Sequence, residues 1–159
     1  MYIFGGKKSA FENTNSMYAF DFTERQWSLI EPKDKSKVPP PIDSFNYVLY
    51  EKNEKEIYFL IFGGYFGGSI GKYSNSIYAY NILENQWEIL FQPQKPKGTN
   101  IYPKKRSNSG IAIWNNKLYV FGGTNGKIKM SDLWTFDLEK RSWEKIVPKE
   151  NIIEVQNAF

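Results

Sequence analysis

Three apolar hexamers, each ending in a glycine pair, decide the fold: MYIFGG at residues 1–6, FLIFGG at 59–64 and LYVFGG at 118–123. Their first residues lie 58 and 59 positions apart. A repeat of this length is typical of architectures in which each unit packs against the next. Apolar residues stand at consecutive positions instead of alternating with polar ones, which predicts strands that are covered on both faces. One unit cannot cover both faces by itself, so neighbouring units are expected to pack on each other.

A fixed pair of aromatic residues follows each hexamer. After the glycine pair and a polar loop of variable length come SMYAFD at 16–21, SIYAYN at 76–81 and DLWTFD at 132–137. A turn then leads to QWSLI at 26–30, QWEIL at 86–90 and SWEKI at 142–146. Nine positions separate the two aromatics in every unit. Because the spacing stays constant while the loops around it vary, it indicates a structural requirement.

This pattern of a double glycine and two spaced aromatics resembles the Kelch repeat, which is about 50 residues long. The resemblance covers nearly the whole chain, and the GH…WD pattern of WD40 repeats is absent. It implies an all-β fold: a partial Kelch β-propeller of about three four-stranded antiparallel blades, not closed within the chain. The signature residues are Gly5, Gly6, Tyr18, Trp27, Gly63, Gly64, Tyr78, Trp87, Gly122, Gly123, Trp134 and Trp143.

The chain is expected to be a single Kelch-repeat domain, 1–159, whose blades do not start and end with the chain. We expect blade one at 1–31 without its inner strand, blade two at 42–91 with an inner strand at 45–50, and blade three at 106–147 with an inner strand at 110–114. A weak strand at 152–158 is a candidate start of a further blade, 151–159. Propellers contain 4–8 blades. Further blades are therefore expected from a longer chain or from a second copy.

The repeated residues have expected structural roles. The tryptophans should fill the contacts between adjacent blades, where each buries ~150–250 Å². The glycine pairs allow positive φ or a close approach of a neighbouring backbone where the strand ends. Asp21, Asn81 and Asp137 share one repeat position, and short polar side chains there stabilise a turn. We interpret them as turn residues, because acids placed once per blade do not converge as a catalytic pair.

Composition argues against an enzyme. The chain contains no cysteine and no histidine, which excludes thiol nucleophiles, thiolate metal sites and histidine-based catalysis. The glycine-rich stretch 63–74 lacks the spacing of a phosphate-binding loop. The sequence therefore predicts no catalytic residue, no cofactor and no metal. Met1 leads directly into a strand without a signal peptide, and the apolar runs are too short to span a membrane. A cytoplasmic protein with no membrane partner is expected.

Charge and topology together indicate a binding face. In an antiparallel blade, the loops that follow the hexamers and the connections between blades lie on one face of the propeller. These loops carry an excess of lysine and arginine, whereas the opposite face is slightly acidic. Such a face attracts acidic partners, and exposed aromatics among the charges could anchor them. The candidate partner-binding residues are Lys7, Lys8, Tyr65, Phe66, Lys72, Tyr73, Tyr102, Lys104, Lys105, Arg106, Lys127 and Lys129.

The leading hypothesis is a non-enzymatic scaffold or adaptor that binds an acidic peptide or protein. The simpler alternative is that the lysines only keep long loops soluble. A cytoskeletal role in association with actin filaments also remains open, because the resemblance allows it. Nucleic-acid binding is disfavoured, since no nucleic-acid recognition motif is present. A non-catalytic part of an enzyme is the least favoured interpretation.

Overall fold

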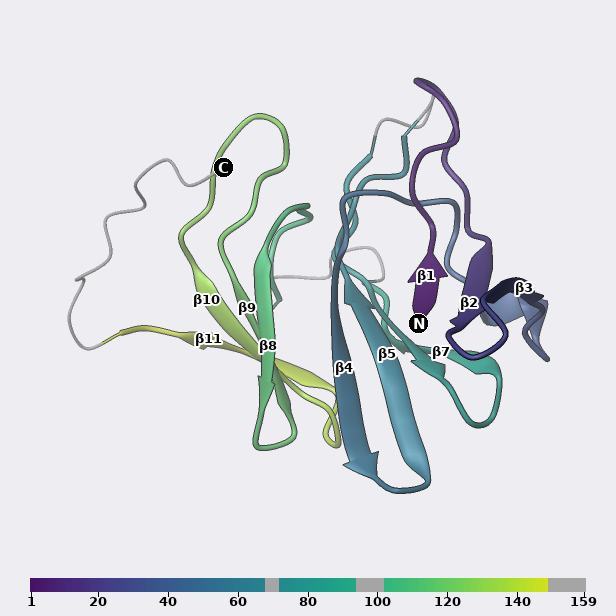
Figure 1. The fold of residues 1–159 in the computed structure, drawn as a ribbon. Coiled ribbons are helices and arrows are strands. Elements are labelled where there is room, and N and C mark those ends of the chain that lie inside the picture. Colours follow the sequence, from purple (N-terminus) through teal and green to yellow (C-terminus); the bar gives the residue numbers. More distant parts are fainter. Residues whose placement is uncertain (68–71, 94–101, 149–159) are drawn as a thin grey trace.

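The computed structural model describes residues 1–67, 72–93 and 102–148, and it folds into three antiparallel sheets. The first sheet contains β1 (Tyr2–Phe4), β2 (Met17–Asp21) and β3 (Gln26–Ile30). The second contains β4 (Asn46–Asn53), β5 (Glu56–Phe62), β6 (Ile77–Asn81) and β7 (Gln86–Phe91). The third contains β8 (Gly110–Trp114), β9 (Lys117–Phe121), β10 (Leu133–Asp137) and β11 (Ser142–Ile146). Figure 1 shows these three blades side by side.

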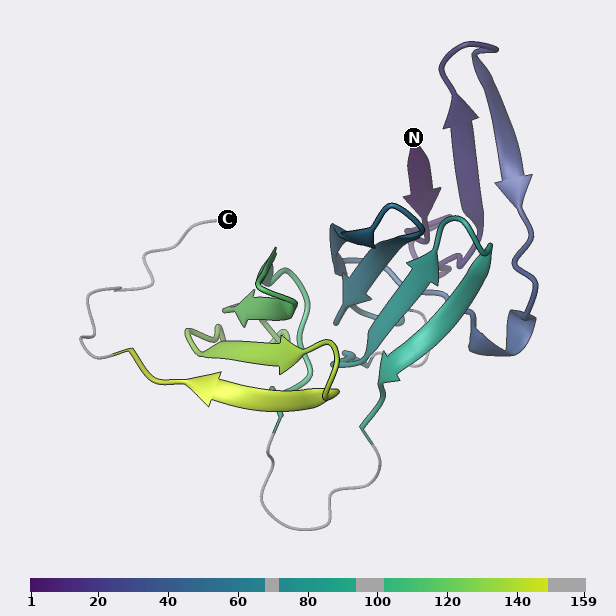
Figure 2. The ribbon, with the colours of Figure 1, turned by 90° about the horizontal axis from the view of Figure 1, so that it is seen from below.

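The strand order within each sheet follows the chain, as expected for propeller blades. Blade two has the order β4-β5-β6-β7, and blade three has β8-β9-β10-β11. In the described residues blade one has only β1-β2-β3, so β1 has a free edge where the other blades carry an inner strand. The inner strands β4 and β8 lie next to each other, and Figure 2 shows the blades from below. The predicted all-β, unclosed Kelch architecture is confirmed.

Strand boundaries differ little from those predicted. The inner strand of blade three is the expected 110–114, while that of blade two runs to Asn53, beyond the expected 45–50. The candidate inner strand at 152–158 lies outside the described residues. A single short 3₁₀ helix, η1 (Lys35–Lys37), interrupts the connection between blades one and two in the described part of the chain. Asp34 caps it by accepting a hydrogen bond from the backbone N–H of Ser36 at 2.9 Å.

The turn before each outer strand has the same construction in all three blades. Asp21 accepts hydrogen bonds from the N–H groups of Thr23 and Glu24 at 2.7 and 3.0 Å. Asn81 and Asp137 each accept the corresponding pair. These hydrogen bonds lower the pKa of the Asp21 and Asp137 carboxyls. The three residues therefore act as turn residues, as the sequence predicts.

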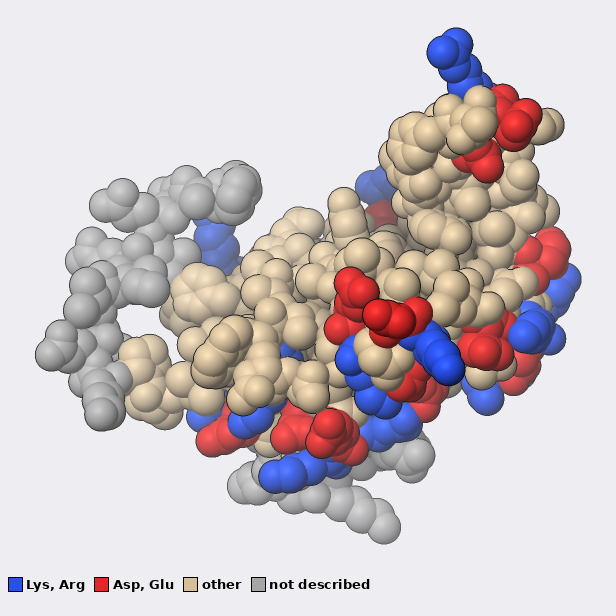
Figure 3. Space-filling view, turned by 60° about the horizontal axis from the view of Figure 1, so that its bottom comes forward, with Lys and Arg blue, Asp and Glu red and all other residues tan. Residues whose placement is uncertain are grey.

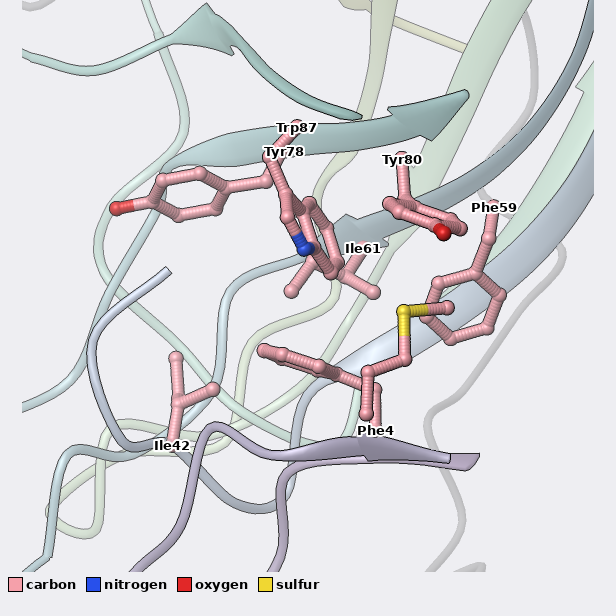
Figure 4. Close-up of a cluster of buried hydrophobic side chains, with 8 residues drawn as sticks. Phe4, Ile42, Phe59, Ile61, Tyr78, Tyr80 and Trp87 are labelled. Atoms are coloured by element: carbon pink, nitrogen blue, oxygen red, sulfur yellow. The ribbon is translucent and has the colours of Figure 1, made fainter. Parts of the chain in front are cut away.

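Packing between blades one and two is built around one tryptophan. Trp87 of β7 is 1% exposed, and its ring centroid lies 4.7 Å from that of Phe4 in β1. Phe59, Ile61 and other side chains of blade two that point toward blade one surround this pair (Figure 4). The tryptophan of blade two therefore packs on blade one.

The junction between blades two and three repeats this arrangement. Trp143 of β11 lies 5.7 Å from Phe62 in β5, ring centroid to ring centroid. Leu118 and Val120 of β9 point toward blade two and are fully buried there. The prediction that the tryptophans fill the contacts between blades is therefore met at both junctions within the chain.

The backbone of the segment that connects two blades packs against the glycine pair of the preceding blade. Gly64 has a φ of 102°, and its N–H donates to the carbonyl of Arg106 at 2.9 Å. Gly6 makes the equivalent hydrogen bond to Ile42. A Cβ on Gly63 would lie 2.5 Å from the Arg106 carbonyl oxygen, which is backbone and cannot rotate away. The pair is therefore required for the close approach of the connecting segment.

We expect Gly63→Ala to lower the free energy of unfolding by at least about 1–3 kcal/mol, because strain at a positive φ adds to the backbone clash. Gly110→Ala is the matched control, since a Cβ there meets only the Phe121 carbonyl oxygen, at 3.9 Å. Urea denaturation measures the free energy of unfolding of both variants. Equal stability of the two variants would show that the connecting segment moves freely away from the glycine pair.

Candidate binding face

The loops that follow β1, β5 and β9 form one continuous face with the segments that connect the blades. We call this the loop face; in Figure 1 it is the upper side. Asp43 of one connecting segment bridges to Tyr65, and Ser107 of the other bridges to Thr124. The Asn13 side chain donates to the Tyr65 carbonyl at 3.0 Å and joins the loops of blades one and two. The loop face is therefore supported by backbone and side-chain hydrogen bonds across both junctions.

An aromatic pair lies on the loop face above blade two. The ring centroids of Tyr65 and Tyr73 are 5.0 Å apart, and both residues are half-buried. Gly126 of blade three lies directly against the Tyr73 hydroxyl, since a Cβ there would be 2.6 Å from it. Phe66 is also half-buried, but it packs against the core cluster between blades one and two. Tyr102 packs on Phe91, with ring centroids 5.4 Å apart.

The lysines of the loop face fall into two groups. Lys7 pairs with the buried carboxylate of Asp43 at 3.9 Å, and Lys8 pairs with Glu12 at 3.7 Å. The others are exposed, and Lys72, Lys104, Lys105 and Lys127 form no ion pair within the described ranges. Lys129 is also exposed. The second group provides the positive charge that a partner can approach.

Arg106 does not fit its predicted role as a partner contact. Its side chain is 0% exposed and makes two hydrogen bonds to the Asp132 carboxylate, at 2.6 and 3.0 Å. It also donates to the carbonyls of Gly122 and Lys104, both at 2.8 Å. Arg106 therefore stabilises the junction between blades two and three and is not available to a partner.

The electrostatics of Asp132 agree with a structural ion pair. Burial by itself would raise the pKa of this carboxyl, but the hydrogen bonds from Arg106 and from the Trp134 indole outweigh it, so the pKa is lowered. The indole Nε1 donates to Asp132 Oδ2 at 2.7 Å. At the equivalent junction between blades one and two, the buried residue is Ile42 and the position of Asp132 holds Ser76. The ion pair is thus specific to one junction.

The first half of the connection from blade one to blade two does not lie on the loop face. The Lys33 N–H donates to the Asn85 carbonyl at 3.0 Å, and its ammonium lies 3.7 Å from Glu84. Both partners belong to the turn between β6 and β7. This turn lies at the end of the blade opposite to the loop face. The expectation that the connections between blades lie on the loop face is therefore wrong for Lys33. The charges of residues 31–37 nearly cancel, so the basic sign of the loop face is unchanged.

Charges on the opposite face of the molecule are mostly compensated. Figure 3 shows Lys and Arg interspersed with Asp and Glu there. Lys52 pairs with Glu56 at 3.0 Å, and Arg141 pairs with Glu88 across the junction of blades two and three. Lys72, Lys104, Lys105 and Lys127 on the loop face form no ion pair with a described residue, and this contrast supports a difference in potential between the two faces.

Sequence reasoning missed Phe11, which is 84% exposed in the loop between β1 and β2. The loop is closed by a hydrogen bond from the Lys8 N–H to the Glu12 carbonyl at 2.8 Å, and the Phe11 N–H donates to Ser9 Oγ at 3.3 Å. These bonds hold the ring away from the core. A lone aromatic residue between Ser9 and Glu12 was the available signal.

Within the described ranges, no three Asp or Glu side chains gather in a group that could hold a metal ion, and no helix is long and apolar enough to cross a membrane. The candidate site is therefore a surface of lysines and aromatic rings, suited to binding another molecule.

Comparison with known proteins agrees with the repeat. A model of the KLHDC2/KLHL20/DRC7 Kelch-repeats domain matches residues 1–158. The chain is 31% identical over 150 residues to Kelch domain-containing protein 10 of Xenopus tropicalis, covering 92% of this chain and 34% of that protein. It is 29% identical over 148 residues to its Homo sapiens counterpart, covering 92% and 31%. Tip elongation aberrant protein 3 of Schizosaccharomyces pombe is 29% identical over 177 residues, covering 92% and 15%. The chain spans about a third or less of these relatives, and it belongs to the Kelch-repeat family.

Proposed function

We propose that this chain is a non-enzymatic, cytoplasmic scaffold or adaptor module whose loop face binds an acidic peptide or protein. Membership of the Kelch-repeat family indicates a protein-interaction module. The observation that carries the finer proposal is a group of exposed lysines that form no ion pair with any described acidic residue: Lys72, Lys104, Lys105 and Lys127. Blades from a longer chain or a second copy complete the ring around this face.

The aromatic residues of the loop face complement these lysines. The Tyr65 ring packs on that of Tyr73, which follows Lys72 in the chain and lies against Gly126, the neighbour of Lys127. Phe11 projects from blade one. Aromatic side chains supply large contact areas at interfaces, while surrounding charges set the partner's sign and speed association. An acidic segment that carries apolar residues fits this combination best.

Reversing two lysine charges tests the proposal. We expect Lys104→Glu with Lys105→Glu to weaken binding of acidic, fluorescently labelled peptides at least about tenfold, or ~1.4 kcal/mol. The effect should shrink at high salt, because exposed charges are screened. Fluorescence anisotropy with a pool of Glu-rich peptides, and with a matched pool of Lys-rich peptides, measures it.

The control reverses two lysines away from the loop face, Lys55 and Lys140, which are exposed in turns on the opposite side. It changes the net charge by the same amount. An equal loss of binding in the control would show that only total charge matters. Equal binding of the Lys-rich pool would contradict an acidic partner.

A further inference from the structure

The side of blade one that faces away from blade two is apolar and uncovered. We call it the open face of blade one. Five large side chains on it are between 38 and 53% exposed: Met1, Ile3, Tyr18, Trp27 and Leu29. Contiguous apolar patches of this kind on a folded protein mark interaction sites.

The repeat shows what normally covers such a face. In blade two the residues at the repeat positions of Met1, Ile3, Tyr18 and Trp27 are Phe59, Ile61, Tyr78 and Trp87. All four are between 1 and 9% exposed, because blade one packs against them. The open face of blade one therefore has the side chains of an inter-blade junction, and no blade among the described residues packs on it.

The two junctions within the chain define the partner of each tryptophan. Trp87 packs on Phe4 and Trp143 packs on Phe62. Phe4 and Phe62 stand at the fourth position of their hexamers, directly before the glycine pair. In the third hexamer this position is Phe121. By the same pattern, the tryptophan of a following blade would pack on Phe121. No described tryptophan of this chain does so.

Phe121 is half-buried and belongs to a second apolar face, the outer face of blade three, on which no described blade packs. Leu118 and Val120 of β9 point toward blade two, so the alternation of a strand turns Tyr119 and Phe121 to the other side. Trp114 of β8 lies on this side too, with its ring centroid 6.3 Å from that of Tyr119, and it is 69% exposed. The chain thus carries both halves of an inter-blade junction, one at each end of the arc.

We propose that these two faces bind each other between two copies of the chain, with Trp27 of one copy on Phe121 of the other. The contact forms twice, head to tail, and closes two arcs of three blades into a ring of six. Six lies within the 4–8 blades of known propellers, and a head-to-tail interface gives a closed ring when its rotation closes. This deepens the proposed function by naming the source of the missing blades. It does not depend on the charge of the loop-face partner.

A second copy fits the open face better than an unrelated apolar surface. The face requires a blade whose aromatic and aliphatic side chains recur at the spacing of Phe4 and Phe62. The outer face of blade three has that spacing, because it is built from the same repeat. Burial of Trp27 and Phe121 at two junctions supplies aromatic anchors of the kind that dominate interface energy.

Charge complementation tests the pairing. We expect the chain of 18.6 kDa to sediment as a dimer at about 10 µM. Trp27→Lys and Phe121→Glu should each be monomeric, because both junctions of their homodimers are broken. An equimolar mixture should again sediment as a dimer, since a heterodimer has one Lys–Glu junction and one native junction. Leu83→Lys is the control, because Leu83 is 55% exposed on a turn away from both faces.

Several results would overturn the proposal: a wild-type chain that stays monomeric, single variants that still dimerise, or a mixture that remains monomeric. A monomeric wild type would show that the open face of blade one does not bind a second copy. If Trp27→Lys does not fold by circular dichroism, Leu29→Lys replaces it, since Leu29 is exposed and outside the core clusters. The Lys104→Glu, Lys105→Glu variant should dimerise normally, which separates failure of this proposal from failure of peptide binding.

Discussion

Replacing Arg106 with Ala is expected to lower the free energy of unfolding by about 3–5 kcal/mol. The substitution leaves the Asp132 carboxylate partly buried without its cation, and it also removes the donor to the Gly122 carbonyl. Lys104→Ala, two positions away and exposed, should change stability by no more than about 0.5 kcal/mol. Guanidinium denaturation of the three proteins measures the difference.

The junction between blades one and two suggests how the stability can be regained. There the buried position holds Ile42, and Ser76 replaces the carboxylate. Replacing a buried ion pair by residues that pack without charge is often neutral or stabilising. We therefore expect Arg106→Ile combined with Asp132→Ser to recover most of the loss.

The double variant distinguishes a structural role of Arg106 from a role in binding a partner. If Arg106 acted on a partner and not on the fold, Arg106→Ala would remain stable and the double variant would show no recovery. A stability loss in Arg106→Ala that Asp132→Ser does not relieve would show that the contacts of Arg106 with the carbonyls of Gly122 and Lys104 matter more than the ion pair.

The ion pair also gives stability a dependence on pH. Because the folded state lowers the pKa of Asp132, its contribution is fully present above the ordinary carboxyl pKa of 3.8. It is lost as the pH falls through the lowered folded value. Stability of the wild type should therefore fall more steeply below pH 3.8 than that of the double variant, measured by urea titrations across the acidic range.

Those parts of the fold that depend on local repetition could be predicted from the sequence. The hexamers, the glycine pairs and the nine-residue spacing located the strands of the three blades, because these features follow from strand geometry and from packing of one blade on the next. Asp21 and Asn81 were identified as turn residues for the same reason. Their hydrogen bonds span only two or three residues.

The candidate site was harder to predict, because its properties depend on contacts between distant segments. Arg106 stands beside two exposed lysines, and only its contact with Asp132, 26 positions later, removes it from the surface. Lys33 was placed on the wrong face because its connecting segment passes along the turn of the next blade before it crosses the loop face. Alignment of the repeats could have found the first case, since Ile42 and Ser76 stand at the matching positions.

Tryptophans at one repeat position are expected to differ greatly in their contribution to stability. Trp87→Ala should cost about 3–5 kcal/mol, because Trp87 fills the core between blades one and two and contacts both Phe4 and Tyr80. Trp27 is 45% exposed in the single chain, so Trp27→Ala should cost far less there.

The comparison requires a monomer, because in the proposed dimer Trp27 is buried as well. Both substitutions are therefore made in the Leu29→Lys background, in which the open face of blade one is blocked. In the wild-type background the cost of Trp27→Ala should rise with protein concentration, since dissociation of a dimer contributes to it. A large cost in the blocked monomer would show that Trp27 stabilises blade one itself. A small cost for Trp87→Ala would mean that adjacent blades do not depend on the tryptophan between them.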